Sequence, residues 1–95
     1  TAATDKLWSL INKTPNLNAL FIEASFPNSM HELAKASKHL TPQAMADELT
    51  KLSHNGIDIL AVHLKAAYRA TLVKEIEALG IKGLSVMEAG RVYEW

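Results

Sequence analysis

The chain has 95 residues, ten basic and ten acidic side chains, no cysteine, and 48% hydrophobic residues. This length predicts a single globular domain, residues 1–95, and the missing cysteines exclude disulfides and cysteine-ligated zinc. The balanced charge is unfavourable for non-specific nucleic-acid binding, and the longest apolar run, residues 19–22, is too short to span a membrane.

The first elements are predicted to be a helix and a strand. Residues 4–13 read as a helix with Thr4 as its N-cap, and Pro15 ends it because the residue before proline leaves the helical region. The stripe facing the core is expected to be Leu7, Leu10 and Ile11. Residues 18–26 form a nearly continuous apolar run, typical of a strand buried on both faces.

Two helices should follow this strand. Ser29 and Glu32 have the spacing of a capping box, which predicts a short helix. Thr41 followed by Pro42 indicates an N-cap and first helical position, and the second helix should end before Gly56.

The second half of the chain repeats this alternation. Residues 57–64 are predicted to be a strand and residues 65–80 a helix, while residues 84–88 and 91–95 flank a hairpin turn at Ala89-Gly90. The order α-β-α-α-β-α-β-β predicts an α/β fold. Its first two strands should be parallel, with right-handed crossovers.

Polar side chains mark the ends of the first two strands. Glu23 interrupts the first, and His63 lies near the close of the second, at the edge where ligands of α/β sheets gather. A lone buried carboxylate is costly, so Glu23 needs a partner, and His39 is the best local candidate. Such a pair could act as a general acid and base. The alternatives for Glu23 are bonds to backbone amides or exposure to solvent.

The remaining candidates have simpler interpretations as well. His63 is either a structural histidine or a metal ligand. His31 and His54 are expected to be solvated on polar helix surfaces. Lys65 reads as a surface charge at a helix start, or as a point charge that faces a phosphate.

Four runs of residues resemble the C-terminal portion of class II 3′,5′-cyclic-nucleotide phosphodiesterases, which are metallo-β-lactamase-fold enzymes. The runs are LFIEASFPN (20–28), HLTP (39–42), VHLK (62–65) and VMEAGRVY (86–93). A more distant likeness connects the chain to the tRNase Z enzymes. The resemblance implies the C-terminal half of an αββα sandwich, with a mixed sheet and a final hairpin.

The resemblance also implies roles for residues. Glu23 and His39 would be the catalytic proton-relay pair, and His63 the last histidine ligand of a centre of two divalent metal ions, expected to be zinc. The ions would polarise a cyclic phosphate for in-line attack, yielding a 5′-nucleotide. The alternatives are a tRNase Z-like or other phosphodiester hydrolase of the same superfamily, and an interaction module without chemistry.

The chain departs from the family in ways that limit this reading. The sequence lacks the family's His-x-His-x-Asp-His cluster, its middle histidine and its bridging aspartate. In addition, Lys38 stands where a glycine usually precedes the relay histidine, and Ala66 stands where a proline is common. A catalytic zinc takes three protein ligands or more. We therefore expect a fragment of a larger metallohydrolase domain that neither holds the ions nor catalyses alone.

The expected partners follow from this assignment. The substrate would be cyclic AMP or cyclic GMP, with no nucleic acid or membrane partner. Half of a sandwich should expose an apolar sheet face, so we expect either the N-terminal half of the same protein or self-association to cover it. The sequence leaves both the cytoplasm and the periplasm open as compartments.

Overall fold

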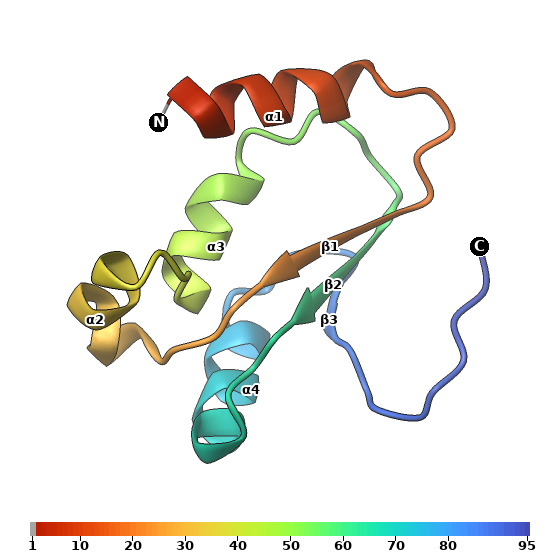
Figure 1. Cartoon of the computed structure of the whole chain (residues 1–95). Helices are drawn as coiled ribbons and strands as arrows, with labels where there is room; N and C mark the ends of the chain where they lie inside the picture. Colours follow the sequence, from red (N-terminus) through yellow and green to blue (C-terminus); the bar gives the residue numbers. More distant parts are fainter. Residues whose placement is uncertain (1) are drawn as a thin grey trace.

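The computed structural model describes residues 2–95, with side chains from Thr4 onward, so Thr1 of the predicted domain lies outside the described residues. The described chain is an α/β fold with four α-helices and one three-stranded parallel sheet (Figure 1). The α-helices are α1 (Ala2–Lys13), α2 (His31–Ala36), α3 (Pro42–Leu49) and α4 (Arg69–Ala78), the strands are β1 (Ala19–Glu23), β2 (Asp58–Val62) and β3 (Leu84–Val86), and the 3₁₀ turns are η1 (Asn28–Met30) and η2 (Ala66–Tyr68).

The three strands lie in the order β1-β2-β3, and both pairs are parallel. The prediction that the first two strands are parallel is confirmed. Glu23 is aligned with Val62, so β1 and β2 end side by side. Side chains from α1, α3 and α4 pack with Ile59 and Ala61, which point to the same face of β2, so these three helices cover one face of the sheet.

The core lies between this helical layer and the sheet. It joins side chains from α1, α3, α4 and β2 and a residue just after β1: Trp8, Ala24, Met45, Leu49, Ile59, Ala61 and Ile76. Met45 and Ala61 are fully buried. None of the helices in the described part of the chain is long and apolar enough to cross a membrane.

At the starts of the helices, one of the three predicted capping signals matches the structure and two do not. Thr41 caps α3 as predicted, because its side-chain oxygen accepts a hydrogen bond from the amide of Ala44, with Pro42 at the first helical position. The predicted N-cap at Thr4 is wrong, since α1 already begins at Ala2. The predicted capping box is also wrong. The chain passes through η1 into α2, where Met30 takes the N-cap position and no side chain caps the helix.

The core face of α1 differs in part from the predicted stripe, because Ile11 packs against the core as predicted and the two leucines do not. Leu7 and Leu10 are 53% and 66% exposed, whereas Trp8 is 6% exposed and belongs to the core. The indole N–H of Trp8 donates to Oε1 of Glu48 at 3.2 Å, and the Asn12 side chain bonds both the Lys51 carbonyl and the Ser53 amide. These contacts to α3 and to the loop after it rotate α1 so that the indole, and not the leucine pair, faces inward.

The predicted final hairpin and mixed sheet are wrong for the described residues, where the only sheet is parallel. Residues 91–95 form no strand after β3. The amide of Glu88 donates to the hydroxyl of Tyr93 at 2.9 Å, and the Trp95 indole N–H donates to Asp58 at 2.8 Å. The segment is therefore held by side-chain bonds instead of a strand ladder, and Trp95 stacks edge-on against Phe21 on β1.

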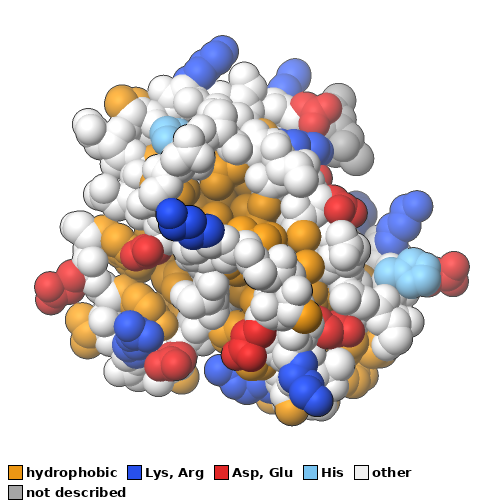
Figure 2. Space-filling view, turned by 180° about the vertical axis from the view of Figure 1, so that it is seen from behind, with side chains coloured by type: hydrophobic (Ala, Val, Ile, Leu, Met, Phe, Trp, Pro, Cys, Tyr) orange, Lys and Arg blue, Asp and Glu red, His pale blue; other side chains and the backbone are white. Residues whose placement is uncertain are grey.

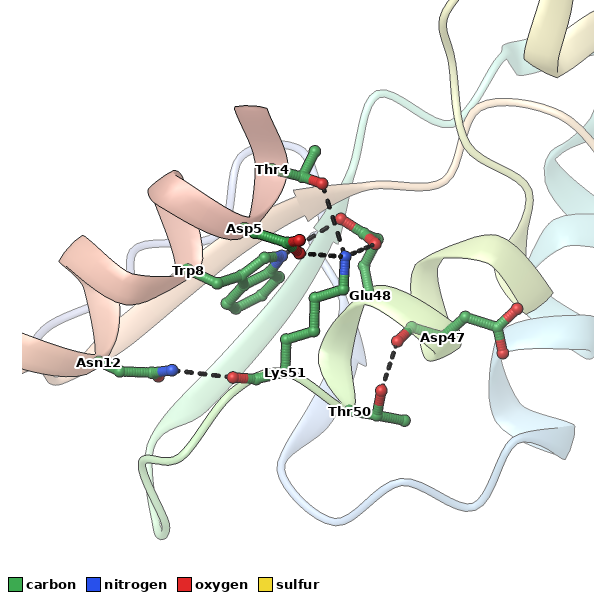
Figure 3. A network of polar contacts seen from close by, with 8 residues as sticks. All are labelled: Thr4, Asp5, Trp8, Asn12, Asp47, Glu48, Thr50 and Lys51. Atoms are coloured by element: carbon green, nitrogen blue, oxygen red, sulfur yellow. Dashed lines mark hydrogen bonds and ion pairs between the residues drawn. The ribbon is translucent and has the colours of Figure 1, made fainter. Parts of the chain in front are cut away.

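A polar network fastens α1 to α3 (Figure 3). The Lys51 ammonium lies 2.9 Å from Glu48 and 3.1 Å from Asp5. The hydrogen bond from Lys51 is the main cause that lowers the pKa of the Glu48 carboxyl below its ordinary value of 4.5. The bond to Glu48 correspondingly raises the pKa of Lys51 above 10.5.

The network predicts a dependence of stability on pH. Because the pKa of Glu48 is lower in the folded than in the unfolded chain, its contribution is present above about pH 4.5 and is lost as the pH falls through the folded value. Glu48→Gln should lower the free energy of unfolding by about 1 kcal/mol at neutral pH, and by less near pH 3. Urea unfolding across this pH range measures the difference, with the exposed Glu32→Gln on α2 as control. An equal loss at both pH values would contradict the assignment.

Candidate functional site

The structure brings Glu23 and His39 together at the carboxyl end of β1. Nδ1 of His39 lies 3.0 Å from Oε2 of Glu23, and the Ser25 hydroxyl donates to the same oxygen at 2.6 Å. The Glu23 side chain is 24% exposed and that of His39 is 43% exposed. The predicted pairing of Glu23 with His39 is confirmed as a contact, and Ser25 adds a donor to it.

A tight turn after α2 places His39. Its amide donates to the carbonyl of Ala34 at 2.8 Å, and Lys38 before it has φ +61°. This is the left-handed region in which glycine is unstrained, which gives a physical reason for glycine at this position in the proteins that the chain resembles. Lys38 adopts this left-handed conformation, and His39 contacts Glu23 at 3.0 Å.

Backbone bonds join the turn to the strand ends. The carbonyl of Leu40 accepts from the amides of Ser25 at 2.9 Å and Phe26 at 3.4 Å, and the amide of Ala24 donates to Val62 at 3.1 Å. The segment after β1 is thus held between the chain that follows His39 and the end of β2. This fixes the carboxylate and the imidazole relative to each other.

Phe26 supports the imidazole from the side. Its ring is 7% exposed and lies 6.0 Å from the His39 ring, edge to face. The Lys65 ammonium lies 5.1 Å from the same Phe26 ring, and Tyr68 packs beside it at 6.3 Å. Neither Ser25 nor Phe26 was predicted to take part in the site, although both follow Glu23 within three residues.

His63 stands apart from this pair. It follows β2 directly, in the left-handed conformation with φ +59°, and its side chain is exposed. It lines a cavity of about 330 Å³ with Arg69 and Arg91, and neither Glu23 nor His39 lines that cavity. All three predicted site residues lie at the same edge of the sheet, but the contact joins only two of them.

The residues present do not fit a two-metal centre by themselves. The described part of the chain contains no group of three or more His, Cys, Asp or Glu side chains placed to hold an ion. His63 could contribute one imidazole, and a catalytic zinc takes at least three protein ligands. Any such centre would need further ligands beyond those described.

The other two histidines differ from each other. His31 is exposed at the start of α2, as expected. His54 was predicted to be solvated, and this is wrong. It is half-buried, and its Nε2 lies 3.0 Å from the carbonyl of Ile11, so it tethers the end of α1.

Comparisons of the chain with family models, curated proteins and solved structures found no match. The family therefore stays a prediction from the sequence motifs. The contacts around Glu23 are the structural observation that bears on its chemistry.

The contact predicts which nitrogen of His39 carries the proton. An ionised carboxylate only accepts hydrogen bonds, so Nδ1 must be the donor to Glu23, and Nε2 is the unprotonated nitrogen of the neutral ring. Imidazole ¹⁵N shifts should show this tautomer in the wild-type chain and in Ser25→Ala. Glu23→Ala should lose the preference, and His31 should be unaffected in both variants. An Nε2–H tautomer in the wild-type chain would contradict the geometry.

Proposed function

We propose that the chain is the C-terminal half of a metal-dependent phosphodiesterase that hydrolyses 3′,5′-cyclic nucleotides, with Glu23 and His39 as its proton relay. The observation that carries the proposal is the 3.0 Å contact between the two side chains, with Ser25 on the same carboxylate oxygen. The four sequence runs that resemble class II phosphodiesterases support the substrate class.

The geometry accounts for how the pair would move a proton. Glu23 accepts from Nδ1–H, so the proton to be transferred is carried on Nε2, at the far side of the ring. In the imidazolium form, Nε2–H can donate to the ribose oxygen that leaves phosphorus. The carboxylate stabilises that charged ring and holds its orientation, while Ser25 and Phe26 hold the carboxylate and the ring in turn.

His63, which follows β2, would be a ligand of the metal ions, whereas the relay pair lies at the end of β1. Bound ions would supply Lewis acidity and an activated water, which the pair itself does not provide. Because the described residues lack the other ligands, hydrolysis would belong to a protein that carries them in addition to this chain.

One observation favours the non-catalytic alternative. Glu23, His39 and Ser25 bond to one another, so the group also satisfies itself as a structural unit would. A tRNase Z-like or other phosphodiester hydrolase would use the same relay. Assays with different substrates therefore have to distinguish the classes of hydrolase. The variants have to distinguish a catalytic role of the pair from a structural one.

The division of roles is testable in the product of the complete reading frame that contains this chain. His39→Ala should reduce turnover of cyclic AMP or cyclic GMP about 100-fold or more and leave bound zinc unchanged. His63→Ala should reduce bound zinc, measured by metal analysis. His31→Ala is the matched control and should change neither quantity.

Other outcomes would reject parts of the proposal. Equal metal loss in the His39 and His63 variants would refute the separate roles. Turnover of bis-p-nitrophenyl phosphate without turnover of cyclic nucleotides would move the chain to another phosphodiesterase class. If the full-length protein hydrolyses none of these substrates, the interaction module without chemistry is the remaining explanation.

The second face of the sheet is where the proposal places the N-terminal half. The helices α1, α3 and α4 pack on the opposite face, and on this face Trp95 packs on Phe21, which stays 52% exposed. Trp95 and Val92 are 50% and 80% exposed. Figure 2 shows the molecule from behind, where hydrophobic side chains gather in the middle of the surface with charged groups around and among them. Such exposed apolar surface commonly marks an interface.

This exposure predicts self-association of the chain when it is alone. Sedimentation of the 95-residue chain should show species larger than the monomer. Phe21→Lys should shift the equilibrium to monomer, whereas Leu33→Lys, at an equally exposed leucine on α2, should not. A monomer at high concentration, or the same effect of both substitutions, would show that the second face is not the contact.

A further inference from the structure

The C-terminal segment, residues 88–95, crosses the second face of the sheet. It starts beyond β3 at one edge of the sheet, and at its end Trp95 packs against Phe21 on β1, the opposite edge strand, with 5.7 Å between the ring centroids. The Trp95 indole N–H donates to Asp58 at the start of β2. Leu60, aligned with Phe21, is 2% exposed although it points away from α1, α3 and α4. The segment therefore lies on the face where the proposed function places a partner.

Trp95 is the residue that fastens this segment to the face. Among the described residues, its bond to Asp58 is the only hydrogen bond between residues 88–95 and the rest of the chain. The other hydrogen bonds of the segment are internal, such as that from the Glu88 amide to the Tyr93 hydroxyl. All of its residues except the half-buried Tyr93 are exposed. The segment can therefore leave the face without breaking a backbone hydrogen bond of the sheet.

Trp95 occupies surface that a second copy of the chain needs. The proposed contact between copies uses Phe21, and Trp95 lies against that ring. The two contacts exclude each other, so a copy associates through Phe21 only while its own Trp95 is displaced. Two associating copies must both be displaced, so the displaced fraction enters the association constant twice. Even a modest preference for the covered state then weakens association considerably.

We propose that residues 88–95 are an intramolecular cap, held in place by Trp95, that limits association of two copies through the second face. The inference rests on the contact surface named in the proposed function, and it requires neither hydrolysis nor bound metal. It also gives a role to the bond between Trp95 and Asp58, which fixes the indole over β1 and β2.

Sedimentation equilibrium of the 95-residue chain and its variants tests the cap. Trp95→Ala should strengthen association about tenfold or more, because the face is then always available. Val92→Ala is the matched control in the same segment, at a side chain that is 80% exposed, and should change association less than about twofold. Asp58→Ala should strengthen association in the wild-type chain and add nothing in the Trp95→Ala background, because both substitutions remove the same bond.

The two indole N–H groups report the cap directly in ¹⁵N NMR spectra. When the concentration is raised until the chain associates, the Trp95 indole signal should shift and exchange faster with solvent, because its bond to Asp58 is broken. The indole of Trp8, which donates to Glu48 in the helix layer, should do neither.

Several results would overturn the cap. Weaker association of Trp95→Ala would show that Trp95 is part of the interface itself. Unchanged association in this variant, equal effects of Trp95→Ala and Val92→Ala, or a Trp95 indole signal that association leaves in place would reject it as well. These measurements involve no substrate or metal, so failure of the cap and failure of the proposed phosphodiesterase activity are distinguishable.

Discussion

The parallel pairing of β1 with β2 determines where Glu23 and His63 lie, because it makes both strands end at the same edge of the sheet. Glu23 is aligned with Val62, and the amide of Ala24 adds one more hydrogen bond to the Val62 carbonyl. Both strands therefore end at the same edge of the sheet. A shift of register by one residue would move the apolar side chains of β1 to the opposite face and take Glu23 with them. The burial of Leu20 and Ile22 against the core therefore also fixes the direction of the carboxylate.

His39 reaches this edge from a different part of the chain. It is 16 residues after Glu23, and only the left-handed turn at Lys38 and the two amides bonded to Leu40 bring it back to the strand. A half-buried carboxylate with no donor would be unfavourable. The imidazole and the Ser25 hydroxyl together satisfy its inner oxygen, so the site is stable without a bound ligand and keeps Nε2 available.

The sequence predicted those features that depend on residues close to one another along the chain. The Thr41-Pro42 start, the two parallel strands and the need of Glu23 for a partner all follow from residues close in sequence. The rotation of α1 does not, because Trp8 turns inward to reach Glu48, 40 residues away. The missing hairpin has a similar cause, since the Trp95 indole bonds to Asp58, 37 residues away. Ser25 was overlooked because its role appears only when Glu23 is placed.

The C-terminal segment connects the second face of the sheet to the cavity beside His63, because Arg91 lines that cavity. Trp95 lies on Phe21, and the ring of Tyr93 stacks on Trp95 at 5.8 Å and under Arg91 at 5.0 Å. A protein layer that covers Phe21 competes with Trp95 for the same surface. Because Trp95 contacts Tyr93 and Tyr93 contacts Arg91, displacing Trp95 would remove one of the contacts that hold the ring beside Arg91. Covering the second face should therefore also change the cavity that His63, Arg69 and Arg91 line, although no residue of the incoming layer need touch it.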